Sequence, residues 1–196
     1  MYQRRDFYRH ARYVHGWLSA FAFITLLFFS VTGLLLNHPE WFEPAQTEET
    51  AKLTLPESVL KSIKQQENPS DTILTYVRQQ QNLVGRYQSS EVMDNEVMIR
   101  LESPAGATDI FVTTDTGETE ITQKPASTVS MLNDLHRGKN SGLGWSWLID
   151  ISAIIYIVLS LAGYILFLSI KTRLVTHLVL TAVSLAMIIL LIWSAV

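Results

Sequence analysis

The sequence predicts a membrane protein with three transmembrane α-helices and an extracytoplasmic α+β domain between the first and the second. Two observations lead to this fold class. Hydrophobic residues make up 48% of the 196 residues and charged residues only 17%, and the hydrophobic ones gather in three long blocks separated by one polar region. The basic residues that flank these blocks gather on one side of them, which gives the helices an orientation.

Each hydrophobic block is long enough to cross a bilayer, because about 20 helical residues span a hydrocarbon core of about 30 Å. We expect a basic cytoplasmic flank, a first span, an extracytoplasmic domain, a second span and a third span. Their expected bounds are residues 1–13, 14–38, 39–142, 146–168 and 174–195. The first block is too long for a cleaved signal peptide and no small-residue cleavage pattern follows it, so we expect a retained helix.

The orientation follows from lysine and arginine, which favour the cytoplasmic side of short flanks. They precede the first span and lie between the second and third spans, as Arg4, Arg5, Arg9, Arg12, Lys171 and Arg173. Tryptophans prefer the interfaces. One lies at the inner end of a span and four lie near outer ends, as Trp17 and as Trp41, Trp145, Trp147 and Trp193. The N-terminus is therefore expected in the cytoplasm and the polar region outside.

The polar region is expected to combine one helix with several strands. Residues 55–67, LPESVLKSIKQQE, place Val59, Leu60 and Ile63 on one helical face after a Pro–Glu start. Strand-like segments follow as TILTYVRQ, EVMIRLES, TDIFVTTD and GETEITQ. Gly117 lies between the last two segments, which is typical of a hairpin turn.

The absence of cysteine excludes several kinds of site. Disulfides, thiolate zinc sites, cysteine-ligated iron–sulfur clusters, covalently attached c-type haem and a cysteine nucleophile all require that residue. The net charge of −3 gives no reason to expect nucleic-acid binding.

Four of the five histidines lie close to span ends, and they sort by side. His15 and His177 open the first and third spans just inside the cytoplasmic face. His38 closes the first span and His136 lies shortly before the second, both at the outer face. His10 is expected to be a flank residue, with the inner site as its reserve role. Each face of the membrane thus has one candidate pair drawn from two segments.

Two pairs of imidazoles suit haem better than zinc or a proton relay. Zinc usually takes further ligands, including carboxylate or thiolate, and none accompanies the inner pair. A proton relay needs polar groups through the bilayer centre, where this chain has apolar residues with Ser, Thr and Gly. Haem iron needs two axial ligands from facing helices and an apolar slot. An alternative also stays open, in which each histidine lies neutral in the headgroup region and bonds water.

Basic residues near the histidines are candidates for pairing with haem propionates. Arg12 and Arg173 lie at the inner face and Arg137 at the outer face. The same arginines are also explained as ordinary flanking charges. Asp150 is a candidate to orient a ligand histidine or to face water.

Small residues could let a macrocycle approach a helix backbone. Gly16, Gly33 and Gly163 have this potential, but they equally permit close helix packing. Helix geometry also limits the outer site. His15 and His38 are twenty-three positions apart, which on an ideal helix is roughly 34 Å of rise and about 140° of rotation. Either the chain unwinds before Pro39, the two haems lie on different sides, or the outer haem is absent.

Two segments resemble a known family. RHARYVHGWLSAFAFITLLFFSVTGLLLNHPEWF (residues 9–42) resembles the first helix of PepSY-associated transmembrane proteins, and LHRGKNSGLGWSWLIDISAIIYIVLSLAGY (residues 135–164) resembles their next helix. The polar region is similar to a PepSY domain. Larger members resemble inner-membrane reductases that pass electrons outward through haem b to ferric siderophores. The resemblance implies haem ligation at His15, His38, His136 and His177, in a bacterial inner membrane with the large loop in the periplasm.

This chain departs from the larger members by having three spans and no glycine-rich dinucleotide motif. Electrons are therefore expected from the quinone pool or a partner reductase. We expect haem b, one or two per chain, and an extracytoplasmic acceptor such as ferric iron, a siderophore or a flavin-bearing partner. A homodimer would thicken the shell around the cofactor. The alternatives are a non-catalytic membrane-anchored PepSY domain that binds or regulates a partner protein, or a metal-uptake subunit that uses His38 and His136.

Overall fold

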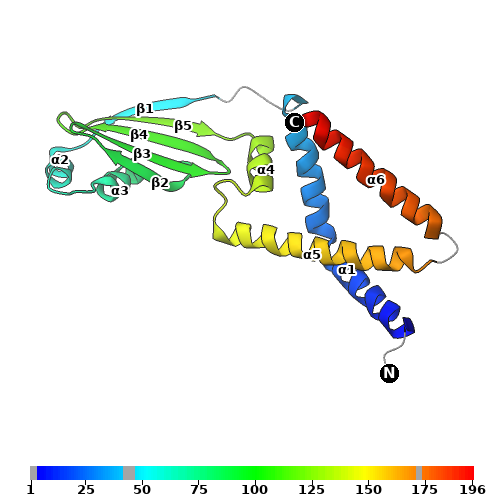
Figure 1. Ribbon diagram of the computed structural model, residues 1–196. Coiled ribbons are helices and arrows are strands. Elements are labelled where there is room, and N and C mark those ends of the chain that lie inside the picture. Colours follow the sequence, from blue (N-terminus) through cyan, green and yellow to red (C-terminus); the bar gives the residue numbers. More distant parts are fainter. Residues whose placement is uncertain (1–3, 42–46, 171–173) are drawn as a thin grey trace. The chain divides into compact units, whose positions relative to one another are not determined.

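The computed structural model describes residues 4–41, 47–170 and 174–196 (Figure 1). Two compact units make up the chain. One is Phe29–Trp147, and the other joins the residues up to Phe28 with Leu148–Val196. Lys171 and Arg173, both candidates above, lie outside the described residues.

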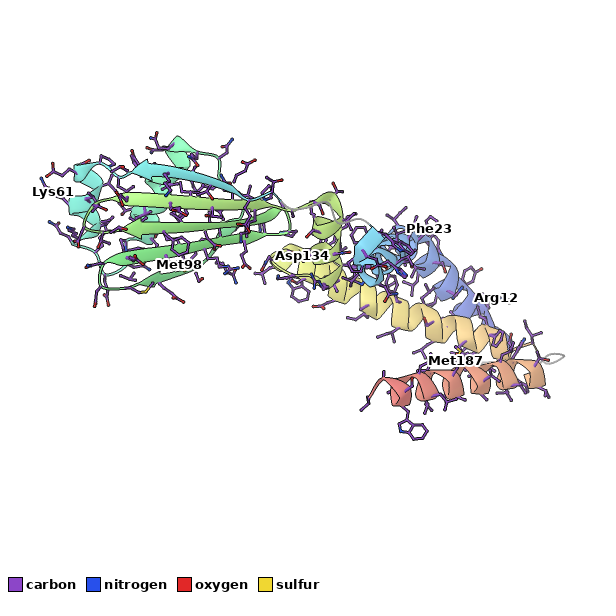
Figure 2. All side chains as sticks on the ribbon, turned by 90° about the horizontal axis from the view of Figure 1, so that it is seen from above. Arg12, Phe23, Lys61, Met98, Asp134 and Met187 are labelled. Atoms are coloured by element: carbon purple, nitrogen blue, oxygen red, sulfur yellow. The ribbon has the colours of Figure 1, made fainter. Side chains whose placement is uncertain are left out.

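Three helices of the described chain are long and apolar enough to span a membrane, namely α1 (Arg4–Asn37), α5 (Leu143–Leu168) and α6 (Leu174–Ala195). Their apolar side chains project outward along each helix, including Phe23 of α1 and Met187 of α6 (Figure 2). Both are more than half exposed, which suits contact with lipid rather than water.

The first helix begins at Arg4, ten residues before the expected span, so the described part of the basic flank is helical too. Asp6 lies in the first turn, where a carboxylate favours the helix dipole, and it pairs with Arg9 at 3.1 Å. Gly16 is the first glycine of the chain and Pro39 its first proline, so nothing breaks the helix earlier.

The same helix ends at Asn37, and the chain unwinds before Pro39. The residue before a proline is disfavoured in helical conformation, which ends the helix here. A short 3₁₀ turn, η1 (Pro39–Trp41), follows. His38 is therefore outside the helix, the first of the three arrangements that the sequence left open.

A five-stranded antiparallel sheet forms the centre of the Phe29–Trp147 unit, in the order β1-β5-β4-β3-β2 (Figure 1). Its strands are β1 (Glu49–Thr54), β2 (Arg86–Val92), β3 (Glu96–Ser103), β4 (Gly106–Thr113) and β5 (Glu118–Pro125). The predicted segments EVMIRLES, TDIFVTTD and GETEITQ correspond to β3, β4 and β5. Gly117 has a φ of 76° in the turn between β4 and β5, which confirms the predicted hairpin.

Two short helices cover one face of the sheet, α2 (Glu57–Ile63) and α3 (Ser70–Gln80). The predicted helix at residues 55–67 is present as the shorter α2. The prediction of a strand at TILTYVRQ was wrong, because this segment is α3. Ile73, Leu74 and Val77 follow helical spacing and bury one face, while Asn68 accepts from the amide of Ser70 at the start.

The core lies between these helices and alternate residues of the central strands, including Val97, Ile99 and Leu101 of β3. The opposite face of the sheet carries Met98, labelled in Figure 2, and Phe111, which is 42% exposed. No apolar pattern pointed to β1 and β2, because both are edge strands on which nearly every residue is exposed or half-exposed. The helix α4 (Thr128–Arg137) also was not predicted.

Candidate functional site

The outer candidate His136 lies in the last turn of α4, whose ends are both capped. The Ser127 hydroxyl accepts from the amide of Ser130 at 3.1 Å, and Gly138 ends the helix with a φ of 70°. Trp145 donates its indole N–H to the carbonyl of Leu135 at 2.7 Å. These contacts fix the turn that carries His136.

The ring of His136 packs against α1 at Gly33. A Cβ added to Gly33 would lie 3.2 Å from His136 Cε1, so only glycine leaves this approach unhindered. Phe29 contacts the imidazole edge-on, with ring centroids 5.5 Å apart. Gly33, one of the three candidate glycines, therefore accommodates a histidine ring.

The Thr32 hydroxyl holds one nitrogen of this ring. Thr32 Oγ1 lies 2.8 Å from His136 Nδ1 and 3.4 Å from the carbonyl of Phe29. When the hydroxyl donates to that carbonyl, its oxygen accepts from Nδ1–H, and the lone pair of the neutral imidazole is on Nε2. Thr32 itself is 2% exposed, so the contact is shielded from bulk water.

His38 has different surroundings. Its ring stacks on Trp41 with centroids 3.9 Å apart, Nδ1 lies 3.3 Å from a Glu40 carboxylate oxygen, and Nε2 lies 3.5 Å from the Asn37 amide. These partners all lie within three residues of it in the chain. The contacts described for His38 and His136 have no residue in common.

The inner candidate His15 packs against α5. Its Nδ1 lies 3.2 Å from the carbonyl of Leu159. A carbonyl oxygen can only accept, so Nδ1 carries the proton and Nε2 carries the lone pair in the neutral ring. A Cβ added to Gly163 would lie 2.9 Å from His15 Cε1, closer than real Cβ atoms approach. Gly16, by contrast, has nothing within 4 Å of an added Cβ.

The other inner candidate, His177, is buried on α6. It is 6% exposed, and its ring stacks on Phe167 of α5 with centroids 3.7 Å apart. Its Nδ1 is buried without a hydrogen-bond partner among the described residues. Leu159, Gly163 and Phe167 follow one another at four-residue spacing, so they share one face of α5. His15 and His177 thus meet successive turns of the same helix face.

A comparison with protein families identifies the chain. A model of PepSY_TM-like proteins matches residues 8–196, which include all three long helices and the sheet. The chain belongs to the PepSY_TM-like family. No curated protein and no solved structure matches it. As a PepSY_TM-like protein it is a membrane protein, and its three apolar helices contact the lipid bilayer.

The arginines predicted to pair with haem propionates have their own surroundings in this PepSY_TM-like protein. Arg137 pairs with Asp134 of its own helix at 2.7 Å. Arg12 is exposed on α1, beside Gly16 and Trp17. Asp150 is exposed and makes no hydrogen bond or ion pair with the described residues. A hydroxyl and a backbone carbonyl therefore orient the histidines instead, which sequence spacing did not indicate.

A metal-ion site of the usual kind is not formed by the part of this PepSY_TM-like chain that the structure describes. Within residues 4–41, 47–170 and 174–196, no three His, Asp or Glu side chains gather closely enough to hold an ion. A haem asks for less from the protein, because one or two axial nitrogens suffice. His15, His177 and His136 fit such a group, since each is half-buried or buried at a helix contact.

Proposed function

We propose that this PepSY_TM-like protein is a b-type cytochrome of a bacterial inner membrane. It would receive electrons from the quinone pool or a partner reductase and deliver them to a periplasmic acceptor such as a ferric siderophore or a flavin-bearing partner. Haem b, when bound, supplies one-electron redox chemistry. The protein's own residues hold the group, shield it from water and tune it.

The observation that supports this proposal is the repeated packing of a histidine against a glycine of another helix. His15 meets Gly163, and His136 meets Gly33. In each case a hydrogen bond engages Nδ1, to the carbonyl of Leu159 or the hydroxyl of Thr32. Metal-bound histidines have this arrangement, because the bond from one nitrogen orients the other toward the metal.

His10 shows that the hydrogen bond alone is not enough. Its Nδ1 lies 2.7 Å from the carbonyl of Asp6, but that partner is on the same helix and the ring is exposed. His177 provides a second kind of support for a bound group, because its buried imidazole Nδ1 has no partner among the described residues. A buried polar atom without a partner costs about 1–3 kcal/mol, so a group that satisfied the ring would recover that cost.

We therefore assign His15 and His177 to an inner haem and His136 to an outer haem. His38 remains the second outer candidate, although its ring already stacks on Trp41 and its two nitrogens lie near Glu40 and Asn37. Arg12 and Arg137, with Arg173 and the remaining basic flank, supply positive charge at the two faces for carboxylates of the bound group.

The test is a dithionite-reduced minus oxidised absorption spectrum of the purified full chain, with haem quantified against protein. We expect low-spin bands and one or two haems per chain. His15→Ala and His177→Ala should each lower the haem content, and His136→Ala should lower it separately. His10→Ala is the matched control and should leave both spectrum and content unchanged. Protein without haem, expressed with haem supplied, would end the proposal.

A non-catalytic role is the alternative, and one observation favours it. The sheet face opposite α2 and α3 leaves Phe111 exposed beside its cross-strand neighbour Met98, as a surface for a partner protein would. A haem-free chain that retained its fold would support this anchored binding domain instead.

A further inference from the structure

The connection between α4 and α5 has an unusual backbone. Three of its five residues, Gly138, Asn140 and Gly142, have positive φ angles of 70°, 55° and 81°. Asn140 is the one residue other than glycine with a positive φ among those described. A left-handed conformation is unfavourable for a residue with a side chain, and asparagine tolerates it best because its side chain can form local hydrogen bonds. The contacts of the Asn140 side chain therefore help to hold this backbone conformation.

The group that holds it is a carboxylate on the sheet. Asn140 Nδ2 donates to Glu102 Oε2 of β3 at 2.7 Å. The other oxygen, Oε1, accepts from Arg100 Nε at 2.6 Å, so each carboxylate oxygen has its own donor. Glu102 is only 18% exposed in its side chain, which strengthens both bonds relative to water.

The surroundings of Glu102 carry charge of both signs. Arg100 and Lys139 are positive neighbours that favour its carboxylate, and Asp109 of β4 lies 3.8 Å from Arg100 on the other side. Arg86, opposite Glu102 on β2, lies close to Gly142, where an added Cβ would come 2.9 Å from Nη1. The loop is thus hydrogen-bonded to β3 through Asn140 and packed against Arg86 of β2 at Gly142.

The loop follows directly after the last turn of α4, which carries His136. The amide of Lys139 donates to the carbonyl of Asp134 at 2.9 Å, and the Ser141 hydroxyl donates to the carbonyl of Gly138 at 2.9 Å. Asn140 is four residues beyond His136. The Lys139 bond connects the loop to the last turn of α4, and the Ser141 bond closes the loop on itself. A shift at Asn140 would therefore be passed on to the last turn of α4, which carries His136.

We propose that Glu102 and Asn140 are positioning residues for His136, and that their hydrogen bond sets how the imidazole meets Thr32 and Gly33. The bond connects the sheet domain to a histidine that the proposed function assigns to a haem. The hydrogen bond would position the His136 ring with or without a haem. Only its effect on the potential of a bound haem rests on the proposed function.

A swap of the two hydrogen-bonding groups tests it. In Glu102→Gln, an amide group faces either Arg100 or Asn140, so one donor meets another donor. In Asn140→Asp, two carboxylates face each other. In the variant that carries both substitutions, the new amide on β3 accepts from Arg100 with its oxygen. Its nitrogen donates to the new carboxylate on the loop, which restores both bonds and the net charge.

The readout is the ¹⁵N resonance of the His136 ring in the haem-free full chain in nanodiscs, assigned by its loss in His136→Gln. Each single variant should move the resonance by more than its linewidth, and the double variant should recover at least half of that shift. The His38 resonance should stay in place, and Glu120→Gln, on the same sheet, should move neither. Single variants without a shift, or a double variant without recovery, would overturn the proposal.

Asn140→Gly is a further check, because glycine keeps the positive φ while removing only the side-chain bond. It should shift the His136 resonance in the same direction as Asn140→Asp, and an unmoved resonance in this variant counts against the proposal even if the swapped pair fails to fold. In haem-loaded protein, the same variants should shift the midpoint potential of one haem. Loss of all haem from the wild-type chain would refute the proposed function and leave the resonance test standing.

Discussion

At the scale of single residues, the four candidate histidines differ in what surrounds each ring. His15 and His136 each have a glycine under the ring and a hydrogen bond at Nδ1. His177 is buried with Nδ1 unpaired among the described residues, and His38 is stacked on a neighbouring tryptophan. The sequence placed all four near span ends, but the partners could not be predicted. His15 and Leu159, or Thr32 and His136, lie more than a hundred residues apart in the chain.

The glycines under the rings give the first prediction. In Gly163→Ala, the new methyl group would lie 2.9 Å from His15, so the ring must shift, and we expect a loss of about 1–3 kcal/mol of stability. Gly16→Ala is the matched control on α1, where nothing lies within 4 Å, and it should be neutral or stabilise slightly. Thermal unfolding in detergent measures both. Equal melting temperatures for the two variants would contradict the described packing.

The threonine beside His136 gives the second. Thr32→Val keeps the shape but removes the hydroxyl, so the unfolding free energy should fall by about 0.5–1.5 kcal/mol and the ¹⁵N resonance of the His136 ring should move. The control is Thr25→Val, because among the described residues the hydroxyl of Thr25 bonds the carbonyl of Ala22 on its own helix. If both variants leave the His136 ring resonance unchanged, the contact at 2.8 Å is not formed in solution.

At the scale of elements, the sequence predicted the helices and strands in which hydrophobic residues recur with a clear period. Strands β3, β4 and β5 alternate because one face lies under α2 and α3. The same reasoning missed the edge strands β1 and β2, because neither buries one face. It also assigned α3 to a strand, because the segment is rich in β-branched residues. Burial against the sheet overrides the intrinsic preference of Ile73 and Val77. The third hydrophobic block corresponds to α6, because a membrane-spanning helix is recognised by its length and apolar character and needs no neighbouring element to cover one face.

The junction between β3 and the α4–α5 loop leads to a prediction on pH. The hydrogen bond from Arg100 lowers the pKa of Glu102, with Asn140 and the positive charges of Arg100 and Lys139 adding to it, while burial opposes. A carboxyl group with a lowered pKa stabilises the fold fully above its ordinary value of 4.5 and loses this contribution as the pH falls through the lowered pKa.

We therefore expect the stability of the wild-type chain to fall more steeply with acid than that of Glu102→Gln. Unfolding midpoints from neutral pH down to about pH 3 measure the two slopes. Glu57→Gln is the control, because its pair with Lys61 is exposed and such pairs contribute little. Parallel curves for wild type and Glu102→Gln would show that the bond is absent.

At the scale of the whole molecule, the proposed topology is testable because the chain has no cysteine. A cysteine introduced at Thr116, exposed in the turn between β4 and β5, would be the only thiol. A membrane-impermeant maleimide should label Thr116→Cys in intact cells with a permeabilised outer membrane. Phe7→Cys, near the start of α1, should react only after lysis. Labelling of Phe7→Cys first would reverse the orientation.

The helix α1 is divided between the two compact units, with Phe28 in one and Phe29 in the other. It also precedes the other described elements in the chain. The sheet domain can close from nearby segments, but His15 must wait for Leu159, which is 144 residues later. At about 5–20 residues per second this delay is on the order of ten seconds. The contact between α1 and α5 would therefore form only late in synthesis, and a truncated chain that ends before α5 would leave His15 without its partner on that helix.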